Sequence, residues 1–137
     1  STPREHRFGY VFRDCILTAD TTVTSADLGR PWRPYADVAY LHCYLGAHIR
    51  PEGWSNWHGT DNDRTARFSE YENFGPGADT TGRVPWSRQL TDGEAAAYTA
   101  HDILGGWTPP GTCPATPAPH PAVPRRAHHT RSPSLKN

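Results

Sequence analysis

Two segments of this chain, 11–17 and 39–45, carry the same pattern of side chains in the same order. When the two are laid over each other, aromatic falls on aromatic, cysteine on cysteine and leucine on leucine, in the pairs Phe12/Tyr40, Cys15/Cys43 and Leu17/Leu45. Self-similarity at a fixed period is typical of stacked repeat architectures, in which equivalent inward side chains lie above one another. The pattern therefore predicts two strands in successive coils of a solenoid.

The aligned cysteines, Cys15 and Cys43, would be neighbours inside such a stack, because the coils of a parallel β-helix lie about 4.8 Å apart. We favour buried free thiols over a disulfide between them, since stacked residues have parallel Cβ vectors even when their Cα atoms are within bonding range. With Cys113, the three cysteines form neither a zinc pattern nor a disulfide-dense scaffold. Cysteine usage therefore leaves the redox compartment and the state of these thiols open.

One helix is predicted near the end of the folded part. Thr91 followed by Glu94 forms a capping box, which marks a helix N-terminus. The helix should run to about Leu104 and stop at Gly105 and Gly106. Before residue 90 no segment shows a sustained helical period, so we expect strands and long loops there.

From Thr108 onward the composition changes abruptly. Eight prolines fall within 108–137, where the only large apolar side chains are Val123 and Leu135. Such a segment cannot bury enough apolar surface to fold, which predicts a polyproline-like or disordered tail over 108–137 after a folded part over 1–107. One alternative makes this Pro/Arg tail the active part, as a peptide ligand for an aromatic-lined groove.

Charge and motifs exclude several classes of function. Residues 1–107 hold 10 basic and 14 acidic side chains, which does not suit a protein that grips a phosphate backbone, so we expect no nucleic acid partner. No stretch approaches the ~20 apolar residues of a membrane-spanning helix, and residues 1–4 do not resemble a signal peptide. The eight histidines lack i,i+4 pairing and no common hydrolase or phosphate-loop motif is present, so we expect no metal.

Arg30 and Trp32 stand out in the segment 28–35, which leads into the second strand. In an extended segment, side chains two residues apart leave the backbone on the same side, so the guanidinium and the indole can face one ligand together. Arginine offers a fork of donors for a carboxylate, and tryptophan offers a flat face to a sugar ring. The structural alternative is an exposed arginine stacked on a tryptophan at the edge of the core.

Two further tryptophans, Trp54 and Trp57, follow beside Arg50 and Glu52. The chain has five tryptophans, more than a small core needs. Aromatic platforms interspersed with polar groups commonly hold carbohydrate, although loop tryptophans can also cap hydrophobic ends. Both interpretations stay open on the residues alone.

At these residues the chain resembles the C-terminal part of a pectinesterase (pectin methylesterase) of bacterial type. The resemblance covers roughly residues 8–107. It rests on a Phe-Gly-Tyr-Val-Phe strand, a Leu-Gly-Arg-Pro-Trp motif and three later segments, found at 8–15, 28–32, 46–57, 68–78 and 83–86. The resemblance implies an all-β fold, a right-handed parallel β-helix represented by its C-terminal coils.

What the resemblance implies about function is the hydrolysis of galacturonate methyl esters in pectin (homogalacturonan) to pectate and methanol. Family members modify or degrade plant cell walls, are secreted and use no metal or cofactor, and we expect a monomer at full length. Their chemistry rests on two aspartates, one nucleophile and one proton donor, with two glutamines that stabilise the oxyanion.

By motif position, Arg30 corresponds to the catalytic arginine that hydrogen-bonds the nucleophilic aspartate. Trp32 and Trp57 correspond to aromatic residues that bind substrate, and Tyr35 borders the same cleft. Gly29, Pro31 and Trp54 fit the motifs as residues that shape the loop.

The segments that carry both aspartates and both glutamines lie upstream of the Phe-Gly-Tyr-Val-Phe strand in this family. Only seven residues precede Phe8 here, and no aspartate of this chain fits the catalytic motifs. We therefore expect a C-terminal fragment of a secreted esterase that is inactive alone. A non-catalytic polysaccharide-binding module, which keeps the aromatic cleft without the acid pair, is the alternative.

Overall fold

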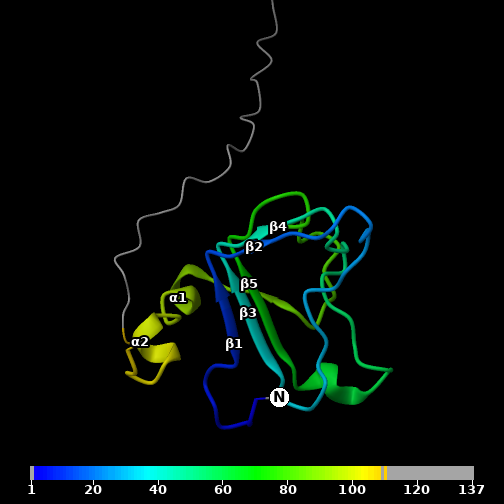
Figure 1. Cartoon of the computed structure of the whole chain (residues 1–137). Coiled ribbons are helices and arrows are strands. Elements are labelled where there is room, and N and C mark those ends of the chain that lie inside the picture. Colours follow the sequence, from blue (N-terminus) through cyan, green and yellow to red (C-terminus); the bar gives the residue numbers. More distant parts are fainter. Residues whose placement is uncertain (1, 109, 111–137) are drawn as a thin grey trace, which may run out of the picture. The chain divides into compact units, whose positions relative to one another are not determined.

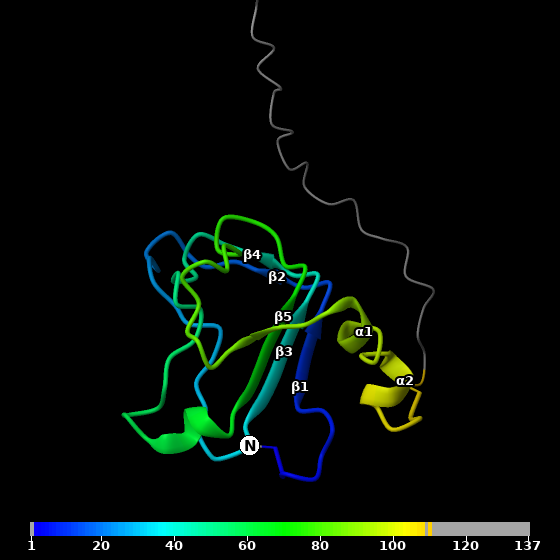
Figure 2. The same cartoon turned by 180° about the vertical axis from the view of Figure 1, so that it is seen from behind.

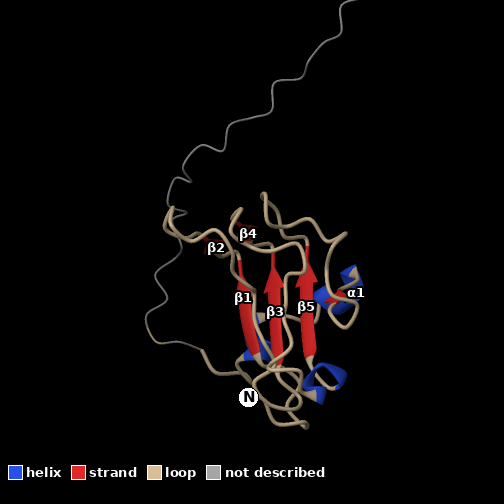
Figure 3. Ribbon diagram, turned by 90° about the vertical axis from the view of Figure 1, so that its right-hand side faces the viewer, coloured by secondary structure: helices blue, strands red, loops and turns tan. Residues whose placement is uncertain are grey.

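The computed structural model describes residues 2–108 and 110, and its strands lie parallel to one another in two small sheets. The first sheet has the order β1-β3-β5-β6, formed by Tyr10–Arg13, Asp37–Leu41, Arg67–Tyr71 and Arg88–Gln89. The second pairs β2 (Ile16–Leu17) with β4 (Tyr44–Leu45). Figure 3 shows β1, β3 and β5 side by side and pointing the same way, so successive turns of the chain stack as coils of a parallel β-helix.

A third side of the coils is formed by loops that meet at two parallel bridges, Ala26 with Ile49 and Gly29 with Trp54. Figures 1 and 2 show these loops on the opposite side of the β1-β3-β5 sheet from the C-terminal helices. The main core fills the space that the sheets and these loops enclose. Its buried members are Leu28, Ala36, Tyr40, Cys43, Leu45, Ile49, Trp54 and Phe68.

The predicted repeat is confirmed as the register between the first two coils. Phe12 pairs with Tyr40 and Leu17 with Leu45, and the two aromatic rings are stacked with their centroids 4.7 Å apart. The third coil is longer: Tyr40 pairs with Glu70, and a 3-10 helix, η1 (Asp61–Arg64), lies in the connection between β3 and β5. An acid thus occupies the position where the earlier coils carry aromatic rings.

The two stacked cysteines are free thiols, as predicted. Cys43 is fully buried and Cys15 half-buried, and the Tyr44 backbone N–H donates to the Cys15 carbonyl at 2.9 Å. The Cys43 thiol donates to the carbonyl of Leu41 at 3.4 Å. Burial raises the pKa of the Cys43 thiol, which disfavours the reactive thiolate. Cys113 lies outside the described residues.

We expect Cys43 to react with iodoacetamide about tenfold or more slowly in the folded chain than in denaturant, because it is inaccessible and its thiolate is disfavoured. Mass spectrometry of the alkylated peptides would give the rates for Cys43 and Cys15 separately. Because the pKa of Cys43 is raised, its rate in the folded chain should still be rising with pH above the ordinary thiol range. Equal Cys43 rates with and without denaturant would contradict the stacked core.

The prediction of one continuous C-terminal helix that runs to about Leu104 is wrong. The structure has two short helices, α1 (Asp92–Ala95) and α2 (Ala100–Ile103). The capping box of Thr91 and Glu94 is confirmed, but Thr99 has extended backbone and its hydroxyl accepts from the Asp102 N–H at 3.1 Å, which starts a second helix. The predicted stop at Gly105 and Gly106 is confirmed, because both have positive φ.

These helices cover the outer face of the first sheet. Ala95 packs with Ala39 and Leu41 in a second small cluster, to which Tyr98 adds its ring. The tail predicted over 108–137 lies outside the described residues except for Thr108 and Pro110, so the division of the chain at residue 107 stays a prediction. In the described part of the chain, no helix has the length and apolar character needed to cross a membrane.

Candidate functional site

Arg30 and Trp32 lie on a loop that is anchored to the core by their neighbours Leu28 and Pro31. Leu28 and Pro31 are buried, whereas the Arg30 side chain is 54% exposed and Trp32 is 61% exposed. The Tyr40 hydroxyl donates to the Leu28 carbonyl at 3.0 Å, and burial raises the pKa of Tyr40 to about 12, so the hydroxyl keeps its proton. The alternation of buried and exposed positions therefore presents the guanidinium and the indole to solvent.

The structure brings Trp32 and Trp57 together. Their ring centroids are 4.6 Å apart with an interplanar angle of 41°, and the imidazole of His58 lies against Trp57 at 4.4 Å. The two loops are held by amide side chains: Asn62 donates to the Pro31 carbonyl at 2.9 Å, and Asn56 accepts from the Trp57 N–H at 2.8 Å. The result is an exposed aromatic surface built from two consecutive coils, of the kind that packs on apolar sugar faces.

Tyr35 does not join this pair. Its backbone has φ +62°, its N–H donates to the Thr65 hydroxyl at 3.2 Å, and the Arg4 guanidinium lies 5.6 Å from its ring centroid. The described residues show no aromatic pairing of Tyr35 with Trp32 or Trp57, so its place at the border of the cleft stays a prediction.

The tryptophans divide between core and surface. Trp54 is 1% exposed and Trp86 packs on the edge of the main core, so both side chains belong to the core packing. Gly29 lies against Trp54, where a Cβ would come within 3.2 Å of the indole. Gly29 and Trp54 therefore shape the loop, as their motif positions implied, while Trp32 and Trp57 form the aromatic surface.

Arg30 is in contact with Asp27. Its Nε donates to Asp27 Oδ2 at 3.4 Å, and its Nη2 lies at 3.4 Å from the same oxygen. The Ser55 hydroxyl also donates to Asp27 Oδ2, at 2.8 Å, and Arg50 Nη1 lies 3.4 Å from Oδ1. Two arginines thus share one carboxylate, whose side chain is only 6% exposed. Motif comparison did not assign this aspartate a role.

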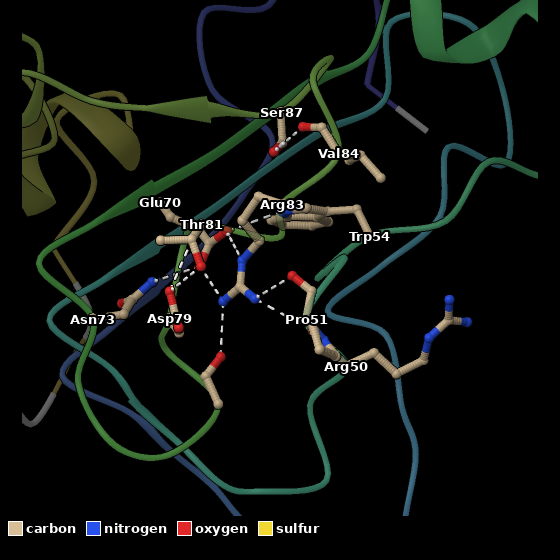
Figure 4. Close-up of polar contacts among 11 residues, drawn as sticks. Arg50, Pro51, Trp54, Glu70, Asn73, Asp79, Thr81, Arg83, Val84 and Ser87 are labelled. Atoms are coloured by element: carbon tan, nitrogen blue, oxygen red, sulfur yellow. Dashed lines mark hydrogen bonds and ion pairs between the residues drawn. The ribbon is translucent and has the colours of Figure 1, made fainter.

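A buried ion pair that the sequence analysis missed supports the site from within. Arg83 binds Glu70 through two hydrogen bonds, Nε to Oε1 at 2.8 Å and Nη2 to Oε2 at 3.0 Å, and the two side chains are 5% and 1% exposed. The Trp54 indole N–H donates to Glu70 Oε1 at 3.2 Å, and Arg83 also donates to the carbonyls of Arg50 and Pro51 (Figure 4).

This pair fixes the loop that carries Trp57. Gly53 has φ +70°, and a Cβ there would lie 2.5 Å from the Arg83 side chain, so the loop and the guanidinium fit closely. In the register of the strands, Glu70 lies beside Tyr40, which lies beside Phe12, so an inward position carries a buried acid that needs a cation. The sequence does not show this by a constant spacing, because the step from Tyr40 to Glu70 is longer than the step from Phe12 to Tyr40. Within residues 2–108 and 110, no group of three or more His, Cys, Asp or Glu side chains is placed to hold a metal ion.

The model of the Pectinesterase family matches residues 2–107 of this chain. Pectinesterase 31 of Arabidopsis thaliana is 44% identical over 96 residues, which cover 70% of this chain and 30% of that protein. Pectinesterase 1 of the same plant is 35% identical over 108 residues, which cover 74% of this chain and 18% of that protein. The chain therefore spans less than a third of the length of these relatives.

The solved structures to which this chain is similar are also pectin methylesterases. Pectin methylesterase from carrot superposes with a TM-score of 0.70 at 28% identity, covering 77% of this chain and 36% of that one. PemA, the pectin methylesterase from Erwinia chrysanthemi, gives 0.64 at 32% identity, covering 80% and 38%. The bacterial type suggested by the resemblance is not supported, since these curated relatives are plant proteins and the two structures come from a plant and a bacterium.

Proposed function

Because this chain belongs to the pectinesterase family, we propose that it supplies the arginine and the aromatic surface of an esterase that hydrolyses galacturonate methyl esters in homogalacturonan. The products are pectate and methanol. The observation that carries the proposal is the exposed Arg30 guanidinium on the same short loop as Trp32, whose ring packs on Trp57 at 4.6 Å. Similar pectin methylesterases have been solved in complex with hexasaccharides, at 30% identity and a TM-score of 0.61 for one of them.

In this mechanism Trp32 and Trp57 bind sugar rings and Arg30 acts on a carboxylate. A guanidinium beside the nucleophilic aspartate favours its ionised form and fixes its direction of attack on the ester carbonyl. The second aspartate gives a proton to the leaving methanol and then takes one from water, while two glutamines stabilise the oxyanion. We assign these four groups to coils that precede Phe8 in the complete protein.

Two aspartates of this chain near the coils are unsuited to the nucleophile's role. Asp27 is 6% exposed and is occupied by Ser55 and Arg30. Asp37 is 5% exposed and pairs with Arg67 at 3.1 Å, and burial raises its pKa, which disfavours the nucleophilic carboxylate. Neither of these two carboxylates is therefore placed to attack an ester carbonyl.

The proposal extends to the handedness of the coils and to the domain and location of the complete protein. The coils wind in the right-handed sense, and residues 1–107 are the C-terminal part of the β-helix domain. The complete protein is secreted, monomeric and independent of cofactors. Reading the frame upstream of Ser1 tests this cheaply: an in-frame Gly-x-x-Asp-Phe-like strand with preceding glutamines favours the enzyme, and its absence favours a binding module.

In the protein extended by that segment, we expect Arg30→Lys to lower kcat by about 100-fold or more with little change in KM, because a point charge on a flexible stem cannot hold the nucleophile as a guanidinium fork does. Methanol release from highly esterified pectin measures both constants. Arg33→Lys, a change at an exposed neighbour, is the matched control. Turnover of the Arg30→Lys variant within a few-fold of the parent would show that the role of Arg30 is wrong.

A further inference from the structure

We propose that Asp27 is a positioning residue for Arg30, holding one side of its guanidinium so that the other side is presented to the carboxylate on which Arg30 acts. This inference rests on the proposed function of Arg30. The Nε–H of Arg30 donates to Asp27 Oδ2 at 3.4 Å, and Nη2 of Arg30 lies 3.4 Å from the same oxygen. None of the contacts among residues 2–108 and 110 uses Nη1, so that part of the fork remains available.

The carboxylate of Asp27 is the fixed member of the pair. Its side chain is 6% exposed, against 54% for Arg30, and the Ser55 hydroxyl of the next coil donates to its Oδ2 at 2.8 Å. The backbone on either side is tied to the next coil, since Ala26 bridges Ile49 and the Leu28 N–H donates to the Gly53 carbonyl at 2.6 Å. A rigid acceptor can therefore orient an arginine that is otherwise free to move in solvent.

Arg50 limits how strongly Asp27 neutralises Arg30. Its Nη1 lies 3.4 Å from Asp27 Oδ1, which accepts no hydrogen bond among the described residues, and its Nε donates to Glu52 at 3.3 Å. Figure 4 shows the Arg50 side chain pointing away from Arg83, which holds only the backbone of that loop. One buried carboxylate is thus shared by two cations, so Arg30 is oriented while it keeps attraction for a further carboxylate.

The cluster contains its own matched control. Asp27→Asn removes one negative charge that touches both Arg30 and Arg50, whereas Glu52→Gln removes one negative charge that touches Arg50 alone of the two. Both substitutions conserve size. Ser55→Ala gives a second route to the same effect, because it releases the anchor of Asp27 and leaves every charge in place.

The experiment measures the exchange of the Arg30 Nε–H with water by ¹⁵N NMR on the full 137-residue chain, with the resonance assigned from an Arg30→Lys sample. We expect Asp27→Asn to speed this exchange about fivefold, as the loss of a hydrogen bond to a charged group does, and Ser55→Ala to speed it less. Glu52→Gln should leave it within about twofold, because Glu52 is not in contact with Arg30.

Equal effects of Asp27→Asn and Glu52→Gln would overturn the proposal, since the cluster would then act on Arg30 only through its net charge. No effect of either would also overturn it, since Asp27 would then not hold the Arg30 guanidinium. The Trp54 indole N–H, held by buried Glu70, reports whether each variant is folded. If Asp27→Asn is unfolded, Ser55→Ala decides the question. A methyl-esterified oligogalacturonate added to the same samples tests the proposed function separately: failure to shift the Trp32 and Trp57 indole resonances would count against that function and leave the exchange result unchanged.

Discussion

Replacing Arg83 with methionine is expected to lower the free energy of unfolding of the chain by several kcal/mol. Glu70 would remain 1% exposed with its carboxylate unpaired, and breaking a buried ion pair by removing one partner typically costs about 3–5 kcal/mol. That is a large part of the stability of a small domain, about 5–15 kcal/mol. The substitution also removes donors from the carbonyls of Pro51 and Gly77, which hold two loops together.

Urea unfolding followed by near-ultraviolet circular dichroism would measure the loss of free energy, because Trp54 and Phe68 pack in a fixed geometry at 4.6 Å. Arg64→Met is the matched control, since it breaks an ion pair with Asp61 in which both side chains are more than three-quarters exposed. Similar midpoints for the two variants would mean that the Glu70–Arg83 pair does not stabilise the fold.

A second substitution separates the ion pair from simple loss of packing. In Glu70→Gln the side chain can still accept from the Trp54 indole, but it no longer carries a charge that needs Arg83. Combined with Arg83→Met, it should restore part of the lost stability, because no uncompensated charge remains in the core. If the two losses simply add, the two side chains contribute independently and the buried charge is not the cause.

The first two coils could be predicted from sequence because inward side chains repeat in kind when coils stack. Phe12 over Tyr40 and Leu17 over Leu45 are visible as one constant spacing along the chain. The third coil was hidden because its column carries Glu70 in place of an aromatic residue, at a longer spacing from Tyr40 than Tyr40 has from Phe12. A solvated loop can gain residues without disturbing the stacked strands, so the period is not constant.

The variation in loop length between coils also explains which parts of the site could be predicted. The exposed Arg30 and Trp32 and the half-buried Trp57 follow from short motifs. For Arg30 and Trp32, local alternation decides which side chains leave the loop. The contact between Asp27 and Ser55 could not be predicted from the motifs. The neighbouring bridges join Ala26 to Ile49 and Gly29 to Trp54, and these two pairs have different spacings along the chain, so no constant period relates the two loops. Only the folded coils show that these loops place a buried carboxylate under Arg30.

The 137-residue chain alone is expected to release no methanol from highly esterified pectin above background. Arg30 can position a nucleophile, and Trp32 and Trp57 can hold a sugar, but the nucleophile, the proton donor and the oxyanion donors are not among the residues that fit the family's motifs. A positioned acid or base contributes about 10²–10⁴-fold and an oxyanion donor about 10²–10³-fold. Groups that act as a unit lose nearly all catalysis when one is missing.

The assay compares the whole chain with a chain that lacks residues 108–137, beside an active pectin methylesterase as the positive control. Equal background rates for both chains would also remove the tail from consideration as a source of activity. Steady methanol release that Arg30→Ala abolishes would overturn the proposal, because it would require an aspartate of this chain to act as the nucleophile. Asp27 is the aspartate in contact with Arg30, and with 6% of its side chain exposed and Ser55 on its Oδ2, it would first have to leave its pocket to reach an ester.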